Sequence, residues 1–128
     1  MKKVGVTYHP KSELARRCAG DIHARLGALV ADAWLAAAWD DEAVAAHVAG
    51  TDLLLTCGGD GTVLRAARAV IPHPVTLLGV NLGRIGFLTE ITFEALMPRL
   101  EEIIGGAGRT ETRAMIEAEM IRAGEEVR

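Results

Sequence analysis

The residues with the clearest chemical potential form the segment Gly58–Thr62, which reads GGDGT. It directly follows an apolar run that ends at Cys57 and directly precedes a segment with helical spacing. Glycine permits a tight turn with positive φ and lets a ligand approach the backbone closely. The N-terminus of the following helix offers unpaired N–H groups and a partial positive charge, which favour an anion. The segment therefore predicts a phosphate-binding loop, in which Thr62 can cap the helix and donate to a phosphate.

Asp60 lies in the middle of this loop, and two interpretations of it stay open. It can be a turn aspartate that bonds its own backbone. It can also be the carboxylate that positions a hydroxyl nucleophile in phosphoryl transfer, while cations hold the transferring group. Between Gly58 and Thr89 it is the only carboxylate, beside the cations Arg65, Arg68 and Arg84. Arg65 lies one turn into the helix and can reach back toward the loop, whereas Arg68 fits a solvated helix face.

The loop matches neither of two familiar phosphate-binding motifs. Its glycine spacing differs from the dinucleotide-binding fingerprint, and no Lys follows where a P-loop requires one. Phe87 is the aromatic residue placed to meet a base, because Gly83 and Gly86 expose the backbone around it, although a core role is equally compatible. Cys57 is interpreted as a small buried hydrophobe, with sensitivity to alkylation left open. None of the four histidines has a partner that suggests catalysis.

The elements that must position these residues alternate between strand and helix. Ala28–Ala33 is a weak strand, and the alanine-rich stretch from Trp34 fits a strand or a helix. Alternation of this kind implies right-handed crossovers and a parallel sheet. The apolar runs and caps predict strands over Lys2–Tyr8, Leu53–Cys57 and Val75–Val80, and helices from Ser12 to Leu26, from Asp40 to Val48, over Val63–Val70 and over Phe93–Ile104.

The predicted fold is therefore an α/β domain, a Rossmann-like three-layer parallel sheet with helices on both faces. Residues 1–108 form this domain, which ends at the Gly105–Gly108 loop. Alternating residues over Thr110–Met120 and a turn at Ala123-Gly124 predict a β-hairpin. We expect this hairpin, within residues 109–128, to begin a second, β-rich domain that is incomplete.

Composition excludes several classes of protein. The 128 residues carry 14 basic and 17 acidic side chains, a formal charge of −3, which offers no basic excess for nucleic acid or a membrane surface. Two cysteines make no disulfide scaffold, and no Cys/His cluster suggests a metal site. No apolar run is long enough to span a membrane and no signal peptide is present, so the expected compartment is the cytoplasm.

Two motifs together carry a resemblance to a known family. The loop Gly58–Thr62 with Val63–Arg68, followed by the block Leu78–Glu90 (LGVNLGRIGFLTE), resembles the ATP-dependent NAD kinases. The first motif alone is shared with diacylglycerol and sphingoid kinases. The second motif at this distance is more specific.

The resemblance implies transfer of the γ-phosphoryl group of ATP to the 2′-hydroxyl of the adenosine ribose of NAD, which forms NADP. A divalent metal, usually magnesium, accompanies the nucleotide, the partners are small-molecule nucleotides, and full-length family members form homo-oligomers. The implied roles are a general base at Asp60, NAD contacts at Asp60, Gly61 and Arg65, an adenine site at Phe87 and Leu88, and phosphate contacts at Gly58, Gly59 and Thr62.

The sequence departs from the family in one respect. An Asn followed by Asp or Glu binds a ribose in the family's second half, and here the only Asn is Asn81. We therefore expect the chain to be the N-terminal part of such a kinase, with little or no activity alone. Two alternatives to this interpretation stay open: a lipid or sugar kinase with the same loop, and a non-catalytic nucleotide-binding module.

Overall fold

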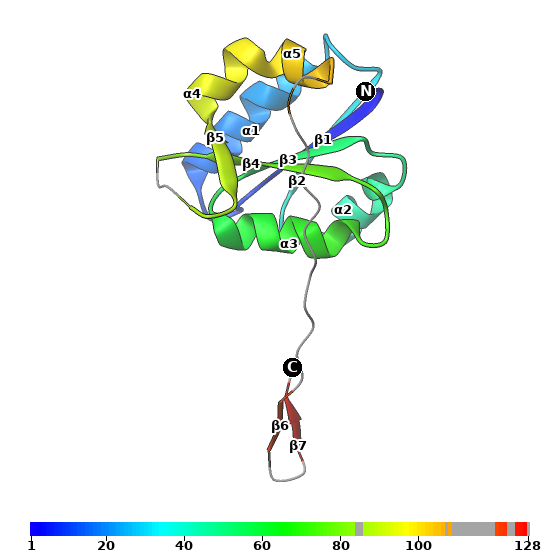
Figure 1. The fold of residues 1–128 in the computed structure, drawn as a ribbon, viewed down its shortest axis with the longest axis vertical. Helices are drawn as coiled ribbons and strands as arrows, with labels where there is room; N and C mark the ends of the chain where they lie inside the picture. Colours follow the sequence, from blue (N-terminus) through cyan, green and yellow to red (C-terminus); the bar gives the residue numbers. More distant parts are fainter. Residues whose placement is uncertain (84–85, 107, 109–119, 123–124, 128) are drawn as a thin grey trace.

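A five-stranded parallel sheet forms the centre of the molecule (Figure 1). The computed structural model of the chain describes residues 1–83, 86–106, 108, 120–122 and 125–127. The strands lie in the order β2-β1-β3-β4-β5, and each neighbouring pair is parallel. Their bounds are β1 Lys3–Tyr8, β2 Asp32–Ala37, β3 Leu53–Cys57, β4 Thr76–Asn81 and β5 Thr89–Thr92. The predicted α/β class with a parallel sheet is confirmed.

Helices cover both faces of this sheet (Figure 1). On one face α1 (Glu13–Leu26), α4 (Phe93–Leu96) and α5 (Leu100–Ile104) pack on a core that includes Val6 and Leu55. On the other face α2 (Asp41–Val48) and α3 (Asp60–Val70) pack on Leu54 and its neighbours. Because successive residues of a strand point to opposite faces, the near-continuous apolar run of β3 serves both cores. The three-layer prediction is therefore confirmed.

Two of the predicted helix starts are made by side-chain caps. Ser12 Oγ accepts a hydrogen bond from the Ala15 N–H at 3.1 Å and begins α1. Asp40 Oδ1 accepts one from the Ala43 N–H at 3.1 Å and begins α2. Each cap satisfies an N–H group that has no partner within its helix.

Several predicted boundaries were wrong. The second strand is Asp32–Ala37 rather than Ala28–Ala33, and it carries Trp34 into the core, where the indole N–H donates to Thr51 Oγ1 at 3.1 Å. β5 was not predicted. The helix expected over Phe93–Ile104 is interrupted by the 3-10 turn η1 (Met97–Arg99), which contains Pro98. A proline removes one backbone donor and clashes with the preceding turn, which accounts for the interruption.

The predicted hairpin is present as two short antiparallel strands, β6 (Met120–Arg122) and β7 (Glu125–Val127). The turn residues Ala123-Gly124 and most of Thr110–Met120 lie outside the described residues. Whether this hairpin begins a second domain stays a prediction. Within the described ranges, we find no helix that is long and apolar enough to cross a membrane.

Gly5 offers a test of how closely the sheet packs. A Cβ placed on Gly5 would overlap the buried indole of Trp34 and lie 2.8 Å from its Cδ2 atom. We expect Gly5→Ala to lower the free energy of unfolding by about 1–3 kcal/mol, because the hydrogen-bonded indole has nowhere to move. Gly20→Ala in α1 is the matched control, since its Cβ meets nothing within 4 Å. It should raise stability by about 0.5–1 kcal/mol. Urea unfolding of both variants measures the difference, and equal midpoints would contradict the packing argument.

Candidate functional site

The GGDGT loop lies where an open α/β sheet is expected to bind its ligand. The strand order reverses between β1 and β3, because β2 lies on one side of β1 and β3 on the other. Ligands bind at the carboxyl ends of the strands beside such a reversal. Gly58 directly follows β3, so the chain itself places the loop at this point.

The loop leaves a set of backbone donors free at the start of α3. Gly59 is the N-cap residue and makes no side-chain cap, while its carbonyl accepts from Thr62 N–H at 3.1 Å and Val63 N–H at 3.2 Å. Among the described residues, no acceptor bonds the N–H groups of Gly59, Asp60 or Gly61. Free N–H groups at the N-terminus of a helix favour an anion.

Thr62 occupies a different position from the one predicted. It lies in the first turn of α3 and not at the cap, which is Gly59, so the expectation that Thr62 caps the helix was wrong. It is only 1% exposed, and within the described part of the chain its hydroxyl has no hydrogen-bond partner. A Cβ on Gly58, whose φ is +155°, would lie 2.5 Å from this hydroxyl. Gly58 therefore lets the Thr62 side chain pack directly against the loop backbone, which a side chain at position 58 would prevent.

Asp60 is fixed by the second motif rather than by its own turn. Its Oδ2 accepts a hydrogen bond from the Phe87 N–H, and its Oδ1 accepts one from the Leu88 N–H, both at 2.9 Å. These two backbone donors, with that of Phe87 the larger influence, hold the pKa of Asp60 below its ordinary value of 3.8. The interpretation of Asp60 as a turn aspartate that bonds its own loop was therefore wrong.

Gly86 makes this contact between the two motifs possible. A Cβ on Gly86 would overlap Asp60 Oδ1 and lie 3.0 Å from Asp60 Cγ. Gly79 in β4 also permits a close approach, since a Cβ added to it would lie 2.8 Å from the Leu88 carbonyl oxygen and 2.9 Å from Thr89 Cα. The two glycines let the segment before β5 approach the loop closely.

Arg65 does not reach back toward the loop as expected. Its Nε donates to the Ala38 carbonyl at 3.2 Å, and its terminal nitrogen bonds the Asp41 carboxylate at 3.2 Å. Its guanidinium carbon lies 4.9 Å from the centre of the Trp39 ring. The side chain is therefore directed to the connection between β2 and α2. Arg68 is exposed, as a solvated helix face predicts, and Arg84 lies outside the described residues.

Phe87 is on the surface and not in the core. Its side chain is 94% exposed, while its N–H is bonded to Asp60. Leu88 next to it is half-buried. A large apolar ring held in solvent beside a fixed carboxylate can contact a flat apolar ligand such as a nucleobase, and this is the role that the resemblance implies for it.

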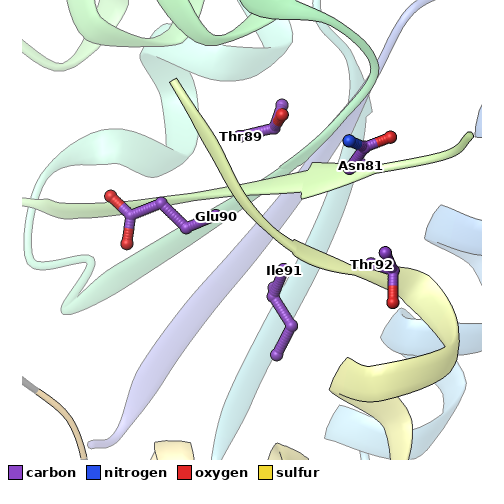
Figure 2. Close-up of a pocket in the computed structure, with 5 residues that line it drawn as sticks. All are labelled: Asn81, Thr89, Glu90, Ile91 and Thr92. Carbon is purple, nitrogen blue, oxygen red and sulfur yellow. The ribbon is translucent and has the colours of Figure 1, made fainter. Parts of the chain in front are cut away.

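A small polar cavity lies beside these residues, between the ends of β4 and β5. It has a volume of about 190 Å³ and is lined by Asn81, Thr89, Glu90, Ile91 and Thr92 (Figure 2). Asn81 Oδ1 accepts from the Gly83 N–H at 2.8 Å, and Figure 2 shows its amide nitrogen on the side of Thr89. Sequence reasoning missed this lining because β5 itself was not predicted. The signal in the sequence was the block Leu78–Glu90, which contains Asn81, Thr89 and Glu90.

The cysteines make a simple prediction about reactivity. Cys57 is fully buried, and burial raises its pKa to about 12. Cys18 is also buried, and burial raises its pKa as well. Because the thiolate is the reactive form, we expect iodoacetamide at pH 8 to leave both residues unmodified in the folded chain and to modify both in denaturant. Mass spectrometry measures the outcome, and rapid labelling of folded Cys57 would contradict it.

The described residues do not form a metal site of their own. No group of three or more His, Cys, Asp or Glu side chains among them could hold a metal ion. Asp60, the carboxylate of the glycine loop, belongs to no such group. The residues present therefore do not fit a resident metal, and no step is derived through one.

Together, these features define an α/β domain whose glycine loop presents free backbone N–H groups beside a fixed carboxylate, at the carboxyl end of a parallel sheet. A family model described as "ATP-NAD kinase N-terminal domain" matches residues 2–107. The chain therefore belongs to this family, which the two motifs had indicated.

Individual relatives agree with the family match. The chain is 38% identical over 120 residues to a protein of Dehalococcoides mccartyi that is named NAD kinase. The aligned region covers 94% of this chain and 42% of the relative. It is 53% identical over 73 residues to an NAD kinase of Heliobacterium modesticaldum, and 50% identical over 76 residues to one of Azoarcus sp.. These two matches cover 57% and 59% of this chain and 26% of each relative. The chain thus spans less than half the length of the curated relatives that it matches.

Proposed function

We propose that the chain is the N-terminal part of an NAD kinase, which transfers the γ-phosphoryl group of ATP to the 2′-hydroxyl of the adenosine ribose of NAD. The observation that carries this proposal is the position of Asp60. Asp60 lies on the first turn of α3, which begins with the free N–H groups of the glycine loop, and its carboxylate accepts a hydrogen bond from the backbone of the exposed Phe87. Family membership narrows the phosphoryl acceptor to NAD and disfavours a lipid or sugar kinase.

The glycine loop supplies the groups that would hold phosphates. The N–H groups of Gly59, Asp60 and Gly61 are free to donate to phosphate oxygens, and the space beside the Cα atoms of Gly59 and Gly61 is open to 4 Å. The hydroxyl of Thr62 is buried and lacks a partner within the described part of the chain, and it would be a further donor to a phosphate oxygen that approaches it. Because such donors are fixed before the ligand arrives, they stabilise the transferring phosphoryl group without reorganisation.

Asp60 would act on the 2′-hydroxyl mainly by holding it in place. Each carboxylate oxygen has two acceptor sites, and the amides of Phe87 and Leu88 use one on each, so a substrate hydroxyl can still donate to the carboxylate. The lowered pKa makes Asp60 a weak base. Phosphoryl transfer has a loose transition state in which positioning matters more than basicity, so this suits the reaction.

The remaining assignments follow the resemblance. Phe87 and Leu88 would line the adenine end of the NAD site, with Gly61 at its border. An NAD contact for Arg65 also stays a prediction, and it requires the side chain to leave Ala38 and Asp41. A magnesium ion would be brought by the nucleotide, since this ion is commonly held by substrate phosphates and water.

The test is NADP formation from ATP and NAD, measured with an NADP-specific dehydrogenase. It should be run on this chain and on the chain joined to the part of the Dehalococcoides relative that follows the matched region. We expect turnover by the joined protein and little or none by the chain alone. If the joined protein folds and binds NAD but forms no NADP, the proposal is wrong.

A further inference from the structure

A cluster of aromatic and cationic side chains lies on the β1–β2 side of the glycine loop. Trp39 is 42% exposed, although it is a large aromatic residue. The His9 ring lies 4.8 Å from the Trp39 ring, at an angle of 47°. The Arg65 guanidinium lies 4.9 Å from the centre of the Trp39 ring. We call His9, Trp39 and Arg65 the Trp39 platform.

The backbone and one carboxylate hold this platform in place. His9 follows β1, and its N–H donates to the Cys57 carbonyl at 3.1 Å, next to the glycine loop. Its ring Nδ1 accepts from the Lys11 N–H at 3.1 Å. The guanidinium of Arg65 is fixed by the Ala38 carbonyl and the Asp41 carboxylate. The platform is therefore ordered before any ligand arrives, which lowers the entropic cost of binding.

We propose that the Trp39 platform binds the purine base of the phosphoryl donor, ATP, while the donor's phosphates lie on the GGDGT loop. This inference rests on the proposed function for the identity of the donor. Bases stack on exposed aromatic side chains, and an arginine guanidinium adds a cation–π contribution. No assigned role uses Trp39 or His9. Arg65 belongs to the platform while it keeps its bonds to Ala38 and Asp41, so this role replaces the NAD contact that the resemblance implies for it.

The spacing of the strands fits a nucleotide. Trp39 lies just beyond β2, and the glycine loop directly follows β3, with β1 between the two strands. Two strand spacings separate the ends of β2 and β3 by about 10 Å. A ribose and the first phosphates of a nucleoside triphosphate can bridge this gap.

The position of the acceptor supports the same assignment. Phe87 precedes β5, so it lies on the opposite side of the glycine loop from the Trp39 platform. In-line phosphoryl transfer needs donor and acceptor on opposite sides of the transferred group. With the acceptor base at Phe87, the platform on the β2 side is the one left for the donor base.

Binding measurements by calorimetry on the joined protein test this inference. We expect Trp39→Ala to raise the Kd for ADP about fivefold to 150-fold, which is the usual contribution of stacking on one base. The Kd values for NAD and for inorganic tripolyphosphate, which has no base, should stay within about twofold of the unaltered protein. Trp39→Phe keeps an aromatic ring and should restore most of the ADP affinity. Leu35→Ala, which removes a 37% exposed side chain from β2, is the control and should change none of these values.

Two outcomes would overturn the inference. Unchanged ADP affinity in Trp39→Ala, or no ADP binding by the unaltered protein, would show that the Trp39 platform only joins α3 to the start of α2. An equal loss of affinity for ADP, tripolyphosphate and NAD would indicate general misfolding and would also contradict it. NADP formation is measured separately, so a failure of the proposed function is distinguished from a failure of this inference.

Discussion

Asp60→Asn should lower kcat for NADP formation by a factor of about 10²–10⁴, the range expected when a positioned acid–base group is lost. The substitution removes the negative charge and one acceptor oxygen. An Asn side chain presents an N–H₂ group to one of the two backbone donors, Phe87 N–H or Leu88 N–H, which both lie 2.9 Å from the carboxylate. The Kd for NAD should change by less than about tenfold, because Asp60 supplies only one of the contacts to NAD in the proposed site. Steady-state kinetics and calorimetry on the joined protein measure the two effects.

Asp52 provides a closely matched control for this prediction. Its Oδ2 accepts hydrogen bonds from the Lys2 N–H at 2.8 Å and the Lys3 N–H at 3.0 Å, and these donors, led by Lys3, lower its pKa in the same way. It precedes β3 and therefore lies at the amino end of the sheet, away from the glycine loop. We expect Asp52→Asn to loosen the N-terminus and to leave kcat unchanged. Near-full turnover by Asp60→Asn, or an equal loss in both variants, would contradict the role given to Asp60.

The sequence predicted best those parts of the fold that depend on local pattern. The run Leu53–Cys57 is apolar throughout, and every one of its residues is buried. The caps at Ser12 and Asp40 were also identified, because capping involves residues only three positions apart. β5 escaped prediction because its four residues, Thr89–Thr92, alternate between half-buried and exposed and have no apolar run. The order of the strands is set by packing between distant segments, which no local pattern contains.

The candidate site shows the same division between local and distant information. The glycine loop was identified from residue types alone, but the partners of Asp60 lie 27 and 28 residues further along the chain. For Arg65, the sequence predicted a side chain that extends back toward the glycine loop. The structure instead directs it to Ala38 and Asp41, from a connection 24 to 27 residues away. In both cases a tertiary contact decided the direction of a charged side chain.

Gly86→Ala should disconnect the two motifs without changing any polar group. The added methyl would overlap Asp60 Oδ1 and lie 3.1 Å from Thr89 Oγ1, so either the carboxylate or the segment that carries Phe87 must move. We expect the pKa of Asp60 to rise toward 3.8, because the backbone donors that lower it are then lost. A displacement of about 1 Å in a positioning group can cost about 10² in rate, so kcat of the joined protein should fall by about that factor. Carboxyl ¹³C NMR titration and steady-state kinetics measure the two effects.

The direction of the pH dependence distinguishes this explanation from simple misfolding. A carboxyl group whose pKa is lowered by folding stabilises the native state above its unfolded pKa, and this contribution is lost as the pH falls through the folded pKa. The carboxyl ¹³C signal of Asp60 should therefore titrate below pH 3.8 in the unaltered chain, and at a higher pH in Gly86→Ala. Gly61→Ala is the control for the titration, since a Cβ there meets nothing within 4 Å. If Gly86→Ala and Gly61→Ala titrate alike, the second motif does not hold Asp60. Its glycines would then require another explanation, such as direct approach of the nucleotide to the backbone.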